Sequence, residues 1–262
     1  MKTILSINNP FKNTIRLEHA FVWEFLNRQV NKFEKVLDYG SYNGNLLKEL
    51  ANSNLLKTGV GVDLNKEVVE MFQNTLPNNV KLVHLEKNNT IPYPDNYFDC
   101  ITLIGVLEHI HRQDLILSEL NRILRPGGLL IVSVPGKHFF SFLDFGNWKF
   151  IFPRIHKLYI LLRFGRSFYN ERYVDCKNGL FGDIEVEKKW HEHFELNRLS
   201  ELLANFGFIT KESDGFGFFF RLIHNIHYLS PFLKKHLYNL MKKDMIKYNQ
   251  AEIFVAAEKL KE

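Results

Sequence analysis

The sequence predicts an α/β fold in which helices cover both faces of a largely parallel sheet. Two observations lead to this class. Short apolar segments alternate with amphipathic segments up to about residue 135, and two glycines link the first apolar segment to the amphipathic one that follows it. Strands that alternate with helices favour parallel pairing, and ligands of such sheets bind at the carboxyl ends of the strands. We therefore expect functional residues directly after the predicted strands.

The spacing of apolar residues predicts the elements in order. They are a helix over residues 14–31, a strand over 35–39, a helix over 44–52, a strand over 58–63, a helix over 66–75, strands over 80–85 and 98–105, a helix over 113–124 and a strand over 129–134. Gly127 and Gly128 follow Arg125 and Pro126, a pattern typical of the turn that closes a helix. Further on, a helix ending at Gly207 precedes strands over 208–212 and 251–259.

Length and composition predict one globular domain. The chain has 262 residues, of which 45% are hydrophobic, and this is enough for a sizeable core. We expect a single domain over residues 1–262, with a binding core at 35–136 and helical insertions at 137–192 and 214–249. The net charge of +5 permits an anionic partner without requiring one. Cys100 and Cys176 are the only cysteines and form no C-x-x-C pair, so neither a disulfide framework nor a metal site is expected.

The start of the chain does not have the pattern of a signal peptide. Its apolar stretch is interrupted by Asn8, Asn9 and Pro10 before the core of such a signal is complete. No run reaches the roughly 18 apolar residues that a membrane-spanning helix needs. A cytoplasmic protein is therefore expected.

The segment VLDYGSYNGNLL, at residues 36–47, joins the first predicted strand to a helix. Gly40 and Gly44 allow a tight turn and a close approach of the backbone to a ligand. Their spacing is G-x-x-x-G, whereas dinucleotide sites typically have G-x-G-x-x-G. Asp38 precedes the first glycine and suits a positively charged ligand better than a pyrophosphate. Asp63 ends the second predicted strand, 25 positions after Asp38, where its carboxylate can accept hydrogen bonds from ribose hydroxyls.

The sequence resembles the class I S-adenosylmethionine-dependent methyltransferases, in the branch that contains quinone-biosynthesis and related small-molecule enzymes. The segments that carry the resemblance are VLDYGSYNG, VGVDLNKEVVEMF, IPYPDNYFDCITLIGVLEHI and LNRILRPGGLLIVSVPG, which span about residues 35–136. The resemblance implies a Rossmann-like sheet of seven strands whose last strand runs antiparallel. It also implies S-adenosylmethionine as the cofactor.

The resemblance further implies which residues hold this methyl donor. Those around its methionine part would be Asp38, Gly40, Ser41, Tyr42 and Gly44, with Asp63 at the ribose and Leu64 at the adenine. Tyr42 stands where the family often has glycine, and its ring either leans toward the sulfonium or packs over the loop. Many relatives have an aspartate where this chain has Lys87. Glu86 or Asn88 would replace it at the adenine amino group, unless both are surface residues of a loop.

Histidines supply the candidates for proton transfer. Methyl transfer mainly requires alignment of the acceptor and exclusion of water, and a hydroxyl acceptor also benefits from a general base. LEHIHR follows the fourth predicted strand and places Glu108, His109 and His111 at the rim of the cleft. His109 and Glu108 are the candidate catalytic residues, with a structural role for His109 as the alternative. His191 and His193 precede the helix that ends at Gly207, either near the acceptor or packed against the helix.

The two insertions are rich in aromatic residues and in cations. In the first, six cations from Lys137 to Arg166 are accompanied by Asp144 as the only acid before Glu171. Either these helices lie on an anionic membrane surface, or they pack on one another as an acceptor lid with solvated cations. Nucleic acid is the least favoured partner, because IGVLEH replaces the loop typical of enzymes that methylate nucleic-acid amino groups.

The sequence therefore predicts a methyltransferase that transfers a methyl group from S-adenosylmethionine to a small or lipid-linked acceptor, such as a sugar, glycolipid or quinone precursor, most readily at oxygen. Two alternatives remain open. One is a non-catalytic subunit that keeps the fold as an interaction platform. The other, disfavoured by the glycine spacing, is a nucleotide-dependent oxidoreductase.

Overall fold

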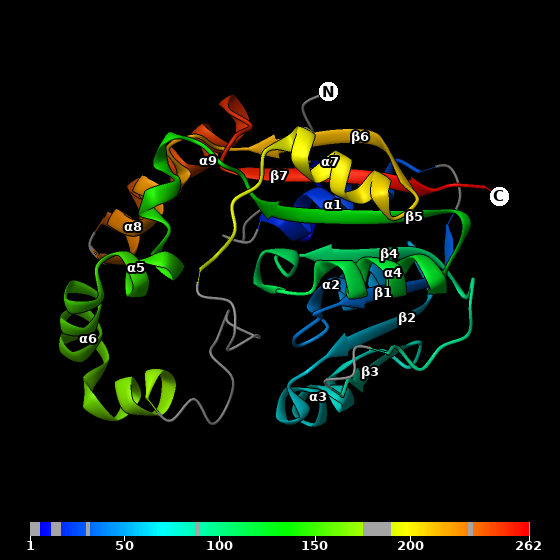
Figure 1. Ribbon diagram of the computed structural model, residues 1–262, viewed down its shortest axis with the longest axis horizontal. Helices are drawn as coiled ribbons and strands as arrows, with labels where there is room; N and C mark the ends of the chain where they lie inside the picture. Colours follow the sequence, from blue (N-terminus) through cyan, green and yellow to red (C-terminus); the bar gives the residue numbers. More distant parts are fainter. Residues whose placement is uncertain are drawn as a thin grey trace.

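A computed structural model describes residues 6–11, 17–29, 32–86, 90–174, 190–229 and 233–261 (Figure 1). Its centre is a seven-stranded sheet of order β3-β2-β1-β4-β5-β7-β6. The strands are β1 (Phe33–Tyr39), β2 (Leu56–Asp63), β3 (Val80–His84), β4 (Phe98–Ile104), β5 (Leu124–Pro135), β6 (Phe208–Phe216) and β7 (Glu252–Lys259). Strand β7 pairs antiparallel with β5 and β6, whereas β1 to β5 pair in parallel. The predicted α/β class, strand number and antiparallel last strand are confirmed.

Helices cover both faces of the sheet. They are α1 (Leu17–Asn27), α2 (Asn45–Asn52), α3 (Lys66–Phe72), α4 (Gln113–Ile123), α5 (Phe145–Ile151), α6 (Pro153–Tyr173), α7 (Leu196–Asn205), α8 (Phe220–Leu229) and α9 (Lys234–Lys247). The described residues also include the short 3₁₀ helices η1 (Gln73–Thr75), η2 (Leu107–His109) and η3 (Phe139–Leu143). No helix in these described ranges is long and apolar enough to cross a membrane.

Alternate residues of the central strands supply the two halves of the core. In β1, Leu37 joins a cluster with α4 and α7, whereas its neighbour Val36 joins a cluster with α1, α2 and α9. In β4, Ile101 and Cys100 divide in the same way. Because side chains of a strand point alternately to opposite faces, a strand covered on both sides is apolar throughout. This is why the central strands were readable as short apolar runs.

The glycine turn before β5 differs from its prediction. Helix α4 already ends at Ile123, and Gly127 lies inside β5 with φ 72°. The pairing of β4 with β5 shifts from Phe98↔Leu124 to Cys100↔Leu129, so one strand advances by two residues and the other by five. The extra residues form a bulge, which glycine accommodates at positive φ. The prediction of a helix-closing turn was therefore wrong, although these residues do turn the chain.

The helical parts of the two insertions gather at one end of the sheet. Figure 1 shows α5, α6, α8 and α9 beyond the carboxyl ends of β1, β4 and β5. Asn225 of α8 donates from Nδ2 to the Leu143 carbonyl at 2.7 Å, which joins the second insertion to the first. Asp244 of α9 accepts from the backbone N–H groups of Phe218 and Phe219, each at 3.0 Å, just before α8 begins. These helices thus stand over the ligand-binding edge of the sheet, and residues 175–189 of the first insertion lie outside the described ranges.

We expect Lys259 to stabilise the end of the sheet. Its buried ammonium donates to Asn96 Oδ1 at 2.9 Å, the Asn121 carbonyl at 2.7 Å and the Leu124 carbonyl at 2.8 Å. Lys259→Met keeps the side-chain length but removes all three bonds, so the free energy of unfolding should fall by about 2–4 kcal/mol in chemical denaturation. Lys211→Met, which breaks an exposed ion pair on the neighbouring strand, should change it by less than about 1 kcal/mol. Equal effects of the two substitutions would contradict the assignment.

Candidate functional site

The loop between β1 and α2 is shaped by glycine. Gly40 has φ 78° and Gly44 has φ 69°, both in the left-handed region. A Cβ on Gly40 would lie 2.4 Å from Val106 Cγ2 in the loop after β4. The glycine therefore serves the close packing of two strand ends as well as the turn. Tyr42 also has positive φ, at 48°, which explains why glycine is common at this position in the family it resembles.

Asp38 is a buried acid at the end of β1. Its Oδ1 accepts a hydrogen bond from Thr102 Oγ1 of β4 at 2.6 Å. Burial raises the pKa of Asp38 to about 7, against the lowering effect of the Thr102 hydrogen bond, and the negative charge of Asp63 adds to the rise. A nearby cation favours the ionised form of such a carboxyl group, because the attraction between the two charges offsets the cost of burying the negative charge. The predicted preference for a positively charged ligand has a physical basis here.

Asp63 ties the end of β2 to the glycine loop. Its Oδ2 accepts from the Tyr42 backbone N–H at 2.8 Å, and its Oδ1 accepts from the Asn65 N–H at 2.9 Å. Each carboxylate oxygen retains further acceptor capacity for a hydroxyl. The Tyr42 ring packs against Phe72, with centroids 6.1 Å apart, which favours the packing alternative for this tyrosine.

The other residues predicted to contact the methyl donor differ in their burial and position. Ser41 Oγ is buried and lacks a hydrogen-bond partner within the described part of the chain. Leu64 is half-buried against the core, directly after β2. Glu86 is exposed two residues after β3, and Asn88 lies outside the described residues.

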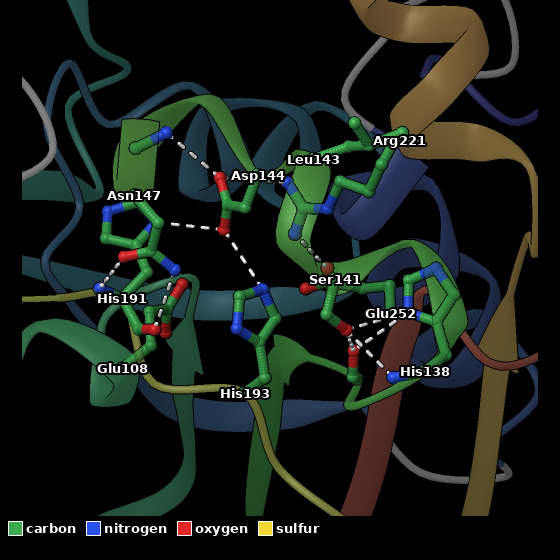
Figure 2. Close-up of polar contacts among 12 residues, drawn as sticks. Glu108, His138, Ser141, Leu143, Asp144, Asn147, His191, His193, Arg221 and Glu252 are labelled. Carbon is green, nitrogen blue, oxygen red and sulfur yellow. Dashed lines mark hydrogen bonds and ion pairs between the residues drawn. The ribbon is translucent and has the colours of Figure 1, made fainter. Parts of the chain in front are cut away.

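A second group of polar side chains lies where the insertions meet the sheet, and we call it the Asp144 cluster. Its members are Glu108, Asp144, His191, His193, Arg221 and Glu252 (Figure 2). Asp144 Oδ2 lies 3.3 Å from His191 Nδ1 and 3.1 Å from His193 Nε2. Arg221 bridges to both acids, with N–O distances of 3.7 Å to Asp144 and 3.9 Å to Glu252. Glu252 also accepts from Ser133 Oγ of β5 at 2.7 Å.

The start of α5 holds His191 in place. The Asn147 side chain donates from Nδ2 to the His191 carbonyl at 3.1 Å and accepts from the His191 N–H at 2.7 Å. Asp144 caps the helix by accepting from the Gly146 N–H at 3.1 Å. A Cβ on Gly146 would lie 2.5 Å from the His191 ring, so only glycine allows this approach. The two histidines are thus positioned by a segment about 45 residues earlier in the chain.

The acids of the Asp144 cluster differ in their proton affinity. Burial by itself would raise the pKa of Asp144, but the Arg221 charge and the hydrogen bonds from His191 and His193 hold it well below its usual range. Burial raises the pKa of Glu108 to about 7, because its backbone hydrogen bond and the charges of His191 and Arg221 offset only part of the effect. Burial likewise raises the pKa of Glu252 well above its usual range. Neighbouring acids with separated pKa values are typical of acid–base sites.

Glu108 lies between the glycine loop and the Asp144 cluster. It belongs to η2, two residues after the Val106 that packs on Gly40. Its Oε2 is buried and has no hydrogen-bond partner among the described residues. His109 is also buried, and its ring meets the His191 ring edge to face at 4.3 Å. The two predicted catalytic residues are therefore interior groups, whereas His111 is exposed at the rim.

Sequence reasoning missed Arg221 and Glu252 altogether. Nothing in their local pattern marks them, because they meet Asp144 only through the folding of α8 and β7. Asp144 itself carried a signal, as the only acid before Glu171 in a cationic, aromatic insertion. In the described part of the chain no group of histidine, cysteine or acidic side chains has the arrangement of a metal site.

A cavity of about 440 Å³ opens at the same end of the sheet, beyond β5. Residues that line it include Lys137, Glu195, Ser213, Lys247 and Asn249. None of them belongs to the glycine loop or to the Asp144 cluster. The cavity therefore lies near the site, but the buried acids and histidines of the site do not line it.

Comparison with known proteins agrees with this geometry. The chain matches the family model described as "Methyltransferase domain" over residues 15–174. It is 32% identical over 114 residues to the ubiquinone/menaquinone biosynthesis C-methyltransferase UbiE of Cupriavidus metallidurans, covering 42% of this chain and 47% of that protein. The corresponding protein of Francisella tularensis is 31% identical over 136 residues, covering 50% and 49%. The chain thus spans about half the length of the curated relatives it matches.

Solved structures share the fold at low identity. A methyltransferase from Aquifex aeolicus, described as dependent on S-adenosylmethionine, has a TM-score of 0.54 at 16% identity, covering 95% of this chain and 94% of its own. The [4+2]-cyclase SpnF has a TM-score of 0.57 at 15% identity, covering 92% and 81%. Because the family model matches more than half of the chain, this protein belongs to the methyltransferase domain family, in the class I fold whose methyl donor is S-adenosylmethionine.

Proposed function

We propose that this protein transfers a methyl group from S-adenosylmethionine to a small amphiphilic acceptor whose hydroxyl group loses a proton to Glu108. The observation that carries the proposal is the position of Glu108. It joins a donor-binding loop on one side to the charged Asp144 cluster on the other.

The residues at the end of β1 and β2 fit the donor. Asp38 is a buried acid whose pKa of about 7 would fall beside the positively charged end of the molecule. Ser41 Oγ is a buried hydroxyl without a hydrogen-bond partner among the described residues, so it can bond to a polar group of the donor. Asp63 keeps acceptor capacity for ribose hydroxyls while it holds the loop through the Tyr42 N–H. When bound, the donor supplies an activated methyl group on a sulfonium.

The Asp144 cluster fits the acceptor side. With a pKa near 7, Glu108 can accept a proton at neutral pH and release it again to solvent. Asp144 holds His191, and His191 and Arg221 favour the ionised form of Glu108, which is the form that accepts the proton. Arg221 offers a cation to an acceptor oxygen that has lost its proton. These groups suit a phenol or enol, whose deprotonation activates the oxygen and the adjacent ring carbon alike.

The methyl group could be transferred either to an oxygen or to a carbon of the acceptor. Sequence patterns favoured oxygen, whereas the named relatives are C-methyltransferases. We propose transfer to a carbon next to the ionised oxygen as the first candidate and transfer to the oxygen itself as the second. NMR of the product distinguishes them, because a methyl on carbon and a methyl on oxygen have different chemical shifts.

An aromatic cluster supports an amphiphilic acceptor. Phe140 of η3 contacts Phe218 and Phe219 with centroids 5.4 Å away in each case. His138 joins this group through its ring contact with Phe218 and through Nε2, which lies 3.1 Å from the Phe218 carbonyl. The apolar rings and the charged cluster meet in the same two insertions. A molecule with a polar head and an apolar body matches both.

The proposal is tested directly with isotopically labelled donor and fractionated small-molecule extracts. A labelled product supports an enzyme over a non-catalytic platform, and its partition into organic solvent supports an amphiphilic acceptor. The comparison with a [4+2]-cyclase of this fold makes the chemical identity of the product the deciding observation. Binding of NADH in preference to S-adenosylhomocysteine would favour the oxidoreductase alternative.

Asp63→Ala should weaken binding of S-adenosylhomocysteine by about 1–3 kcal/mol, because the ribose hydroxyls lose their acceptor. Isothermal titration calorimetry measures the change. Asp114→Ala is the matched control, since Asp114 forms an exposed ion pair with Arg112 and should leave the affinity unchanged. Asp63 also holds the Tyr42 N–H, so thermal denaturation must show that both variants are folded. An unaltered affinity in the folded Asp63→Ala variant would remove this residue from the site.

Binding of S-adenosylhomocysteine should release a proton near pH 7. The pKa of Asp38 is about 7 in the free protein and should fall when the ligand's ammonium group approaches, so protonated Asp38 loses its proton on binding. Calorimetry in buffers with different ionisation enthalpies measures the number of protons released. Asp38→Asn should abolish the release, and Glu108→Gln should preserve it. Proton uptake by the wild type would contradict this placement.

Glu108→Gln should lower the rate of methyl transfer by about 10²–10⁴-fold, because the acceptor hydroxyl loses its general base. In the wild type the rate should rise with pH through about 7, as the carboxyl group of Glu108 ionises. This inflection should disappear in the variant while the affinity for S-adenosylhomocysteine stays the same. His111→Asn, in the same loop but exposed, is the control with an expected rate near that of the wild type. Retention of both rate and inflection would assign the base elsewhere.

A further inference from the structure

Helix α6 is apolar on two opposite sides. Its inner side is marked by His156 and Ile160, which are buried at 4% and 3% exposure. Its outer side carries Ile155, Leu158 and Leu162, exposed at 57%, 58% and 79%. At roughly 100° per residue, the centres of these two sides lie about 150° apart. We call the three exposed residues the α6 stripe.

The α6 stripe is a surface that needs a partner. A helix that packs by one face normally carries polar residues on the other, and three large aliphatic side chains in a row on the solvent side depart from this pattern. Exposed apolar residues also occur in η3 and along the chain from α5 into α6. They include Phe139, Phe142, Phe150, Ile151, Phe152 and Phe164. Figure 1 shows α6 at the outer margin of the molecule, next to α5.

Every aspartate, glutamate, lysine or arginine position from residue 145 to residue 170, the part of the chain that contains the α6 stripe, is a lysine or an arginine. Arg154 and Lys157 lie on one side of the stripe and Arg163 on the other, by their positions on the helix, and all three are exposed. Lys149 and Arg166 add two more cations. No aspartate or glutamate occurs from residue 145 to residue 170. A partner surface that complements this region is therefore negatively charged as well as apolar.

We propose that the α6 stripe and its flanking cations dock on an anionic lipid surface. Aliphatic side chains that enter the acyl boundary and arginine or lysine side chains that reach phosphate headgroups are the two contributions that hold such helices at an interface. A protein partner would have to be both apolar and acidic over the same stripe, whereas an anionic membrane has both properties everywhere. Docking there turns the end of the sheet that carries the Asp144 cluster toward the lipid.

Vesicle flotation of the full chain tests the proposal. Wild-type protein should float with vesicles of phosphatidylcholine and phosphatidylglycerol, and its affinity for vesicles of phosphatidylcholine alone should be at least roughly tenfold lower. High salt should weaken the binding, because the electrostatic part is screened. Absence of binding to the anionic vesicles overturns the proposal.

Two pairs of variants separate the apolar and the charged contributions. Leu158→Ser with Leu162→Ser should weaken binding by roughly tenfold or more, because both side chains lose their apolar burial in the lipid. The matched control is Ile209→Ser with Leu260→Ser, which removes two exposed aliphatic residues from other parts of the surface. Arg154→Gln with Lys157→Gln should weaken binding roughly thirtyfold, from about 1 kcal/mol for each cation. Equal effects of the stripe variant and its control overturn the proposal.

Self-association is the competing outcome. Light scattering would reveal it if the wild type were a dimer and the stripe variant a monomer, with no binding of either to vesicles. That result would assign the α6 stripe to an interface between copies of this chain and overturn lipid docking. The variants should keep their affinity for S-adenosylhomocysteine. The docking result is therefore independent of the proposed methyl transfer, and either proposal can fail without the other.

Discussion

The pairing of the buried Asp144 carboxylate with its neighbours is the interaction on which the arrangement of both insertions depends. Asp144 lies at the start of α5 and meets two histidines from the segment before α7 and an arginine from α8. Three segments far apart in the sequence therefore supply the partners of a single buried carboxylate. A buried charge is costly unless it is paired, so the loss of any one partner disturbs the others. This shared requirement fixes both insertions over the same end of the sheet.

The buried acids at this end of the sheet differ in their proton affinity. Against the effect of burial, the Arg221 charge and the hydrogen bonds from His191 and His193 hold the pKa of Asp144 well below its usual range, whereas burial raises the pKa of Glu108 and of Asp38 to about 7. The latter two acids lie at the ends of adjacent strands, β4 and β1. Asp38 lies next to the loop between β1 and α2, and Glu108 belongs to the Asp144 cluster. The fold thus places two buried acids of raised pKa after neighbouring parallel strands, and the proposed methyl transfer assigns the donor cation to Asp38 and the acceptor proton to Glu108.

The insertions have polar contacts on their inner sides and exposed apolar residues on the outer side of α6, whereas a helix with a single packed face usually has a polar outer side. Their inner sides carry the polar contacts that hold His191 and Arg221, and the outer side of α6 is aliphatic with cations beside it. A purely lid-like role accounts for the inner contacts alone. Such a role does not explain the outer surface, and the proposed docking on an anionic lipid surface accounts for it.

The sequence by itself determined the sheet and the donor loop. Strand alternation and glycine spacing are local, and each strand buried on both faces has to be apolar throughout, so these elements could be read in order. Asp38, Gly40 and Asp63 could be proposed as site residues for the same reason, because the carboxyl ends of parallel strands meet at one edge. The tertiary structure alone decided the Asp144 cluster. Arg221 and Glu252 have no local signature, and the pKa of Glu108 depends on burial by segments far away in the chain. The bulge at Gly127 was likewise decided by the pairing of β4 with β5, since the same two glycines fit a helix end equally well.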